Sequence, residues 1–226
     1  MPQNGLLSRH LHGMLGLTMS VKVKICGVTS LEDAFCAADA GVDALGFMFY
    51  PASPRFISLQ AAAAISQKLP PHIVKVGVFV DAEQELVLRA IAGCGLNLLQ
   101  FHGNESPDYC LQFGLMSMKA FRIKDAASLQ SLADYPTDAW LLDSYVADKP
   151  GGTGEKFNWD LARQAQQLGR PIFLAGGLTP ENVGEAVRQV QPYAVDVSSG
   201  VESSPGKKDR DKVRAFIRAA KKAADL

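Results

Sequence analysis

The 226-residue sequence lacks the features that mark several common classes of protein. Its four cysteines and four histidines form no C-x-x-C pair and no zinc-type spacing, so no metal centre or disulfide framework is expected. No apolar run reaches the roughly 18 residues that a membrane span needs. The 23 basic residues equal the 23 acidic ones, so no excess of charge favours nucleic acid. We expect a cytoplasmic protein without a metal, a membrane partner or a nucleic-acid partner.

The first 20 residues differ from the rest of the chain. They contain Arg9, His10 and His12 but no continuous apolar core, which argues against a secretory signal. They also lack acidic residues, so an organellar transit peptide stays an alternative. We interpret residues 1–20 as a disordered leader or an upstream start, and residues 21–226 as one domain without an internal linker.

Short β-rich segments alternate with helix-like segments from Val21 onward. This order indicates parallel pairing of the strands, because a parallel crossover needs room for a helix. Eight such units in a chain of this length predict an α/β fold, a single (β/α)₈ barrel with eight parallel strands. A doubly wound open sheet is the alternative, but no G-x-G-x-x-G motif follows the first strand. The expected strands are 21–26, 44–49, 74–80, 98–102, 118–123, 140–144, 172–175 and 194–198.

Capping signals support the helices between these strands. Ser30 is a plausible N-cap for the segment that follows the first strand. In "TPENVGEAVRQV", Thr179 is the expected N-cap and Pro180 the expected first helical residue.

Polar residues gather at the carboxyl ends of the predicted strands, where the active sites of these barrels form. They include Cys26, Arg55, Gln100, His102 and Asp143. Taken alone, a strand-end cysteine is more often a small buried hydrophobe, and a strand-end aspartate is often a structural hydrogen-bond partner. Together at one rim, Cys26 and Asp143 favour a base and an acid in proton transfer.

Two glycine-containing loops predict a phosphate site. Gly176 and Gly177 follow the seventh strand, and Ser198, Ser199 and Gly200 follow the eighth. Glycine lets backbone N–H groups approach an anion closely, and the loops after these two strands are the usual phosphate site of such barrels. The alternative is that the glycines only form tight turns.

The alternation of the first strand makes a more specific prediction. Lys22, Lys24 and Cys26 share one face, and the apolar residues between them suit the helix layer. Lys24 then lies inside the barrel below Cys26, where an unpaired charge is very unfavourable. Strand eight neighbours strand one, and Asp196 shares its parity with Ser198. We therefore hypothesise a Lys24–Asp196 ion pair.

Several motifs resemble those of the phosphoribosylanthranilate isomerases. They are "KICGVT", "GFMFYPASPRFIS", "VGVFV", "LLQFHG", "LLDS", "GGTGEKFNW", "LAGGLTPENV" and "AVDVSSGVESSPGKKD". The resemblance runs from about Val21 to the C-terminus, with motifs at all but the fifth strand. Two small departures are Phe101, where a smaller aliphatic residue is common, and Ser144, where threonine is common.

The resemblance implies an isomerase of tryptophan biosynthesis in its monofunctional form, which works without a cofactor on a small-molecule substrate. It implies an Amadori rearrangement with Asp143 as general acid and Cys26 as general base. It also implies that Arg55 holds the anthranilate carboxylate, and we add Gln100, His102 and Asp196 as further candidate substrate contacts. Another aldose–ketose isomerase barrel and a non-catalytic phosphate-binding barrel are the alternatives. The sequence leaves open whether the protein is a monomer or a homodimer.

Overall fold

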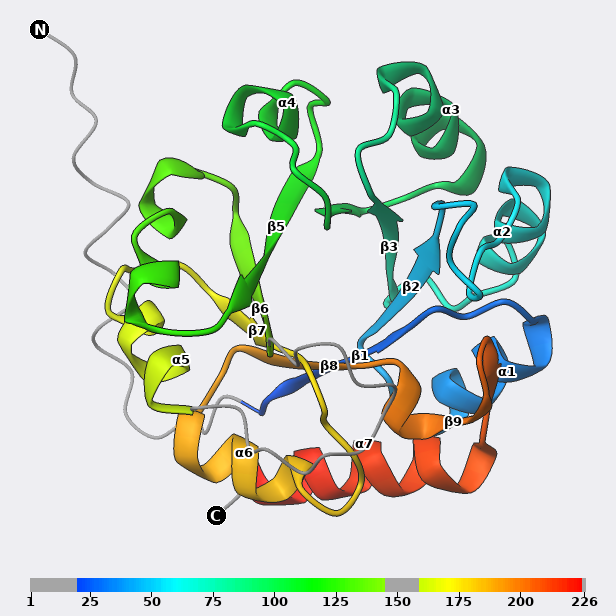
Figure 1. Cartoon of the computed structure of the whole chain (residues 1–226). Coiled ribbons are helices and arrows are strands. Elements are labelled where there is room, and N and C mark those ends of the chain that lie inside the picture. Colours follow the sequence, from blue (N-terminus) through cyan, green and yellow to red (C-terminus); the bar gives the residue numbers. More distant parts are fainter. Residues whose placement is uncertain (1–19, 145–158, 225–226) are drawn as a thin grey trace, which may run out of the picture.

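Eight parallel strands close into a barrel in the order of the sequence (Figure 1). This computed structural model describes residues 20–144 and 159–224. The predicted (β/α)₈ fold is confirmed, and each predicted strand is present within two residues of its expected ends. The strands are β1 Lys22–Cys26, β2 Ala44–Met48, β3 Val74–Phe79, β4 Leu98–Phe101, β5 Met116–Ile123, β6 Ala139–Ser144, β7 Ile172–Leu174 and β8 Ala194–Val197. The leader predicted over residues 1–20 lies, apart from Ser20, outside the described residues.

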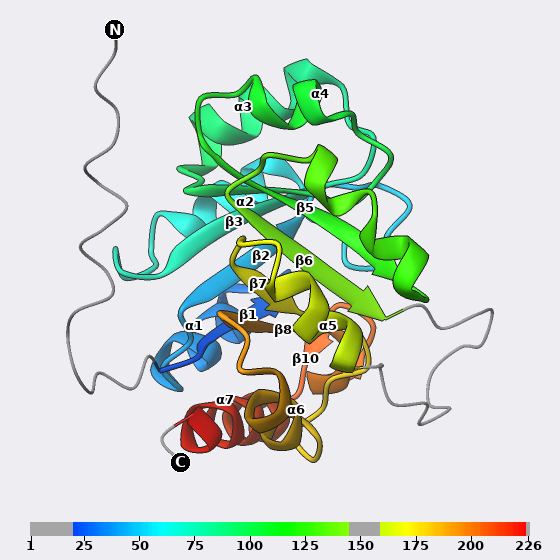
Figure 2. The same ribbon diagram turned by 90° about the vertical axis from the view of Figure 1, so that its left-hand side faces the viewer.

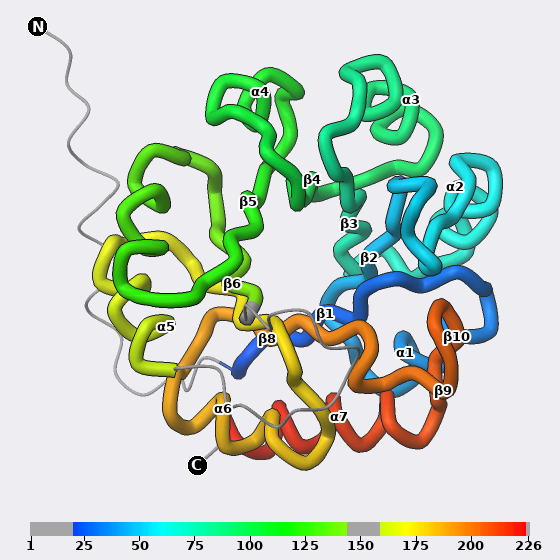
Figure 3. Tube along the Cα trace, in the orientation of Figure 1, coloured from blue at the N-terminus to red at the C-terminus, as the bar shows by residue number. Residues whose placement is uncertain are grey.

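The helices surround the barrel, as the trace in Figure 3 shows. They are α1 Leu31–Asp39, α2 Leu59–Ser66, α3 Gln84–Cys94, α4 Pro107–Leu111, α5 Trp159–Gln166, α6 Val183–Val190 and α7 Arg210–Ala224. Between β5 and β6 the chain forms two short 3₁₀ helices instead, η1 Ala126–Leu129 and η2 Leu132–Asp134. The turned view in Figure 2 shows α6 and α7 side by side. Within the described residues, no helix is long and apolar enough to cross a membrane.

Helix α6 begins later than predicted. Its N-cap is Asn182, whereas the expected start was Pro180 with Thr179 as the cap. The reason is a turn in which the backbone N–H groups of Asn182 and Val183 both donate to the carbonyl oxygen of Thr179. The Asn182 side chain accepts from the N–H of Thr179 at 2.8 Å and donates to the carbonyl of Gly177 at 2.9 Å. This turn ties the glycine loop after β7 to the start of the helix.

Successive residues of β1 face two different cores, as the alternation predicted. Val23 and Ile25 belong to the large core between the strands and the helices. Cys26 belongs to the smaller core inside the barrel, with residues such as Val78 and Leu141. The barrel interior is therefore apolar around Lys24, which is fully buried.

Candidate active site

A cavity of about 230 Å³ opens at the carboxyl-terminal mouth of the barrel. All eleven residues predicted for the site lie around it: Cys26, Arg55, Gln100, His102, Asp143, Gly176, Gly177, Asp196, Ser198, Ser199 and Gly200. They come from β1, β4, β6, β8 and the segments that follow β2, β4, β7 and β8. The cavity is also lined by residues that the sequence analysis did not select, among them Met48, Ser53 and Leu141. A wider hollow of about 740 Å³, lined in part by Pro171 and Tyr193, contains none of the eleven residues.

Cys26 ends β1 with its thiol buried against the cavity. Gly27 follows with φ of +73°, a left-handed conformation that turns the chain away from the barrel. Burial raises the pKa of the Cys26 thiol, and the neighbouring Lys24 ammonium opposes this by its charge and by a hydrogen bond. The neighbouring strand β2 makes room for both groups at Gly46, because a Cβ there would lie 2.9 Å from the Cys26 sulfur and 3.2 Å from Lys24 Nζ.

The hypothesised ion pair below Cys26 is confirmed. Lys24 Nζ donates to Asp196 Oδ1 at 2.8 Å, and the two side chains are 0% and 8% exposed. Lys24 and Asp196 are register partners on the neighbouring strands β1 and β8. Burial alone lowers the pKa of Lys24, but the charges of Asp196 and Cys26 outweigh it, so that pKa is raised. Lys24 is therefore a fixed positive charge beneath the thiol.

His102 connects Gln100 to Asp143. The amide nitrogen of Gln100 lies 3.0 Å from His102 Nδ1. With this amide orientation the nitrogen is the donor, so a neutral His102 carries its proton on Nε2. His102 Nε2 in turn lies 3.5 Å from Asp143 Oδ2, and the Asp143 side chain is 32% exposed. The carboxyl group is therefore accessible to a ligand in the cavity, with the imidazole of His102 beside it.

The two glycine loops contain backbone positions that favour glycine. Gly176 and Gly177 have φ of +82° and +65°. Gly200 packs so closely against the backbone carbonyl of Leu178 that a side chain has no room there. In the second loop, Ser198 Oγ donates to the carbonyl of Cys26 at 3.1 Å, which fixes this loop to the end of β1. Such a backbone cradle suits an anion.

Arg55 reaches the cavity from the loop after β2, but one edge of its guanidinium is already occupied. Its Nε and Nη2 donate to the two carboxylate oxygens of Glu202 at 2.9 and 2.7 Å. These hydrogen bonds raise the pKa of Arg55. Glu202 is a functional residue that the sequence did not reveal, although "VESSPGKK" is part of the resemblance. No local pattern indicates that residues 55 and 202 meet.

The closed barrel and the polar cavity at its carboxyl-terminal mouth define a (β/α)₈-barrel enzyme. No group of three His, Cys, Asp or Glu side chains in the described ranges is arranged to hold a metal ion. Residues 23–219 match the sequence profile of the family described as N-(5'phosphoribosyl)anthranilate (PRA) isomerase. The chain belongs to this family and is an isomerase.

Individual relatives are similar over most of their length. The N-(5'-phosphoribosyl)anthranilate isomerase of Trichlorobacter lovleyi is 56% identical over 203 residues, which cover 90% of this chain and 99% of that protein. The crystal structure of phosphoribosyl anthranilate isomerase from Thermotoga maritima has a TM-score of 0.85 and 43% identity, covering 89% of this chain and 99% of its own. A phosphoribosyl anthranilate isomerase in complex with reduced 1-(o-carboxyphenylamino)-1-deoxyribulose 5-phosphate has a TM-score of 0.81 and 41% identity, with 89% and 99% covered.

Proposed function

We propose that this chain converts N-(5-phosphoribosyl)anthranilate into 1-(2-carboxyphenylamino)-1-deoxyribulose 5-phosphate, an Amadori rearrangement in tryptophan biosynthesis. The observation that carries the proposal is the presence of Cys26 and Asp143 around one cavity with two glycine loops and an arginine. These groups match the parts of the substrate: proton-transfer groups for the sugar, a backbone cradle for the phosphate and a cation for the carboxylate. The related isomerase in complex with reduced product supports this choice of ligand.

The reaction begins with opening of the ribose ring. Asp143 donates a proton to the ring oxygen, the bond between C1 and this oxygen breaks, and the anilino nitrogen supplies electrons to form a Schiff base. The Cys26 thiolate then removes the proton from C2, and the electrons of that bond neutralise the Schiff base to give an enolamine. Loss of the proton from the C2 hydroxyl and protonation of C1 give the ketone. Two protons are lost and two are gained, so the product is an isomer of the substrate.

The surrounding residues support these steps. Lys24 stabilises the thiolate electrostatically, because its ammonium is buried beside the sulfur. Asp196 keeps Lys24 charged and in place from the cavity wall. Gln100 Oε1 is buried and has no hydrogen-bond partner among the described residues. It therefore suits a sugar hydroxyl, whose donated hydrogen bond would satisfy it.

The loops after β7 and β8 would hold the phosphate of the substrate. Gly176, Gly177 and Gly200 present backbone close to the cavity, and Ser198 and Ser199 add hydroxyl groups. The remaining edge of Arg55 would bind the carboxylate through its forked N–H groups.

Turnover of freshly made phosphoribosylanthranilate tests the proposal, because its fluorescence is lost as it isomerises. Wild type should turn over, and Cys26→Ser and Asp143→Asn should each lose about 10²- to 10⁴-fold in kcat, the usual size of a general acid or base contribution. Two matched controls lie on helices away from the cavity, the buried Cys36 and the exposed Asp108. Cys36→Ser and Asp108→Asn should retain activity, with circular dichroism confirming the fold of all variants. A wild type that binds product without turnover would instead indicate a non-catalytic phosphate-binding barrel.

A further inference from the structure

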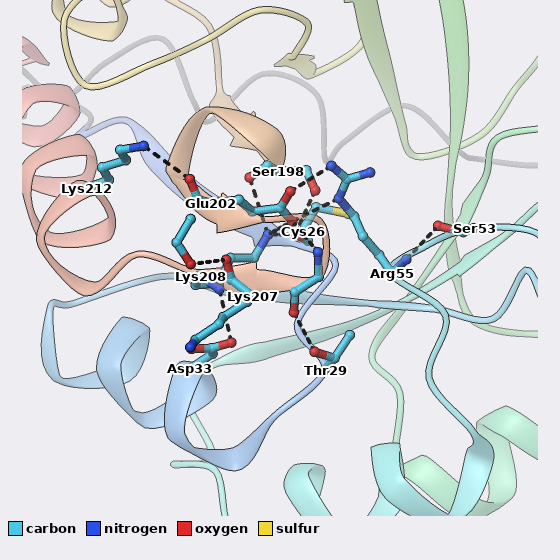
Figure 4. A network of polar contacts seen from close by, with 12 residues as sticks. Cys26, Thr29, Asp33, Ser53, Arg55, Ser198, Glu202, Lys207, Lys208 and Lys212 are labelled. Carbon is cyan, nitrogen blue, oxygen red and sulfur yellow. Dashed lines mark hydrogen bonds and ion pairs between the residues drawn. The ribbon is translucent and has the colours of Figure 1, made fainter. Parts of the chain in front are cut away.

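Residues 202–208, which follow the candidate phosphate loop after β8, have no role in the proposed mechanism. These residues form a small antiparallel hairpin of β9 Glu202–Ser204 and β10 Lys207–Lys208. Figure 4 shows that the side chains of Glu202 and Lys208 point toward Arg55 and Cys26. Thr29 anchors the hairpin turn by donating from Oγ1 to the carbonyl of Gly206 at 2.6 Å. The hairpin therefore packs directly against the carboxyl end of β1.

Glu202 and Lys208 form the buried centre of this contact. Their side chains are 5% and 1% exposed, and Lys208 Nζ donates to Glu202 Oε1 at 2.9 Å. The same ammonium donates to the carbonyl of Cys26 at 2.6 Å and to that of Ser198 at 3.3 Å. One lysine thus contacts the backbone of the candidate base, the start of a candidate phosphate loop and the carboxylate that holds Arg55.

The charges of this cluster do not cancel. Glu202 supplies one negative charge to two cations, Arg55 and Lys208. These two cations lower the pKa of Glu202 against the effect of its burial, so it stays ionised. Arg55 is the most exposed of the three, with 23% of its side chain accessible, and it lines the cavity. Burial lowers the pKa of Lys208, and Arg55 is the member of the cluster that presents positive charge to the cavity.

The position of Arg55 is fixed from three sides. Glu202 accepts from its Nε and from one N–H of Nη2, which leaves Nη1 and the second N–H of Nη2 for another partner. Gly27 lies beneath the side chain, since a Cβ there would meet Arg55 Cδ at 2.6 Å. Ser53 Oγ accepts from the backbone N–H of Arg55 at 3.1 Å. An arginine that is already fixed loses little conformational freedom when it binds an anion.

We propose that Glu202 and Lys208 are positioning residues that orient Arg55 for the carboxylate on the aromatic ring of the substrate. The inference rests on the proposed function, in which Arg55 binds that carboxylate. Lys208 holds Glu202, Glu202 holds one edge of the guanidinium, and the other edge faces the ligand. The hairpin thereby sets the preference for a carboxylated aromatic amine.

The test compares two ligands that differ only in this carboxylate. They are 1-(2-carboxyphenylamino)-1-deoxyribulose 5-phosphate and 1-phenylamino-1-deoxyribulose 5-phosphate, with Kd measured by calorimetry. Wild type should bind the carboxylated ligand about tenfold or more tightly than the other, since charge-assisted bidentate pairs are strong. Glu202→Gln should lose most of this preference while its Kd for the carboxyl-free ligand changes less than about twofold. Lys208→Met should show the same loss.

A matched control lies at the other end of the barrel. Asp43 is also one carboxylate between two cations, 3.3 Å from Lys22 Nζ and 3.2 Å from Lys221 Nζ. Asp43→Asn should leave the ligand preference unchanged. Arg55→Lys provides a second route if Glu202→Gln folds poorly, because it keeps the charge but loses the two-point contact with Glu202. It should also lose the preference.

The outcomes separate the inference from the proposed function. Equal weakening of both ligands by Glu202→Gln, or an unchanged preference in Arg55→Lys, would show that the hairpin only supports the fold and would overturn the inference. If Arg55→Met keeps the full preference, the carboxylate is bound elsewhere, and the role proposed for Arg55 fails together with the inference. Loss of preference in Arg55→Met but not in Glu202→Gln would overturn the inference alone.

Discussion

Replacing Lys24 by methionine tests the buried charge beneath the active site. Methionine has nearly the shape of lysine, so the change removes the ammonium with little loss of packing. It leaves the Asp196 carboxylate, only 8% exposed, without the partner that lies 2.8 Å away in the wild type. Breaking a buried ion pair from one side typically costs about 3–5 kcal/mol of unfolding free energy. For a chain of this size that corresponds to a fall in Tm of roughly 6–20 °C.

The second half of the pair gives a more demanding test. Asp196→Leu should destabilise by a similar amount, because it leaves the Lys24 ammonium buried and unpaired. The double variant Lys24→Met/Asp196→Leu removes both charges of the pair. Replacing a whole buried ion pair by apolar residues often leaves the free energy of unfolding unchanged. We therefore expect the double variant to be more stable than either single variant by about 2 kcal/mol or more, measured by urea unfolding.

The same two residues should act on the Cys26 thiol with opposite signs. Lys24 lowers the pKa of this thiol, and Asp196 raises it. Lys24→Met should therefore slow the alkylation of Cys26 by iodoacetamide at a given pH, and Asp196→Asn should accelerate it, because the thiolate is the reactive form. Mass spectrometry assigns the modified cysteine.

Two results would refute this reasoning. Lys24→Met with unfolding free energy within about 1 kcal/mol of wild type would mean that Asp196 is not left as a buried charge. Alkylation rates that fall in both Lys24→Met and Asp196→Asn would show that loss of structure, and not the local charge, controls the reactivity of the Cys26 thiol.

Three further predictions concern the site and its support. Burial raises the pKa of Cys26, so its thiolate accumulates only at alkaline pH. We therefore expect kcat/KM to rise from pH 7 to about 9, and a flat pH profile would argue against Cys26 as the base. Gly46→Ala places a Cβ 2.9 Å from the Cys26 sulfur and should lower kcat about tenfold or more in the fluorescence assay. If the variant instead turns over as fast as the wild type, the thiol can shift without loss of activity. Phe101 is fully buried, with its ring 6.2 Å from that of Phe79 and 5.7 Å from that of Phe113. Phe101→Ala should lower the free energy of unfolding, measured in urea, by about 3–5 kcal/mol. A decrease below about 1 kcal/mol would contradict its role in the core.

The features that follow from local pattern could be read from the sequence. Alternating strands and helices predicted the barrel, and the parity of β1 predicted that Lys24 faces inward toward Asp196. The strand ends predicted which residues surround the cavity, since parallel strands present their carboxyl ends at one mouth. Side-chain direction in a strand repeats every two residues, so these inferences need only the order of the strands.

Only the tertiary structure decided which side chains meet across the loops. The two 3₁₀ helices after β5 and the later start of α6 depend on turn hydrogen bonds that local propensity does not specify. The contact of Arg55 with Glu202 joins residues 147 positions apart, through two loops that closure of the barrel brings together. No periodicity encodes such a contact, because loop conformation is set by packing against distant segments. The sequence thus determined the barrel and the residues at its mouth, and the tertiary structure determined how the charges at that mouth are shared.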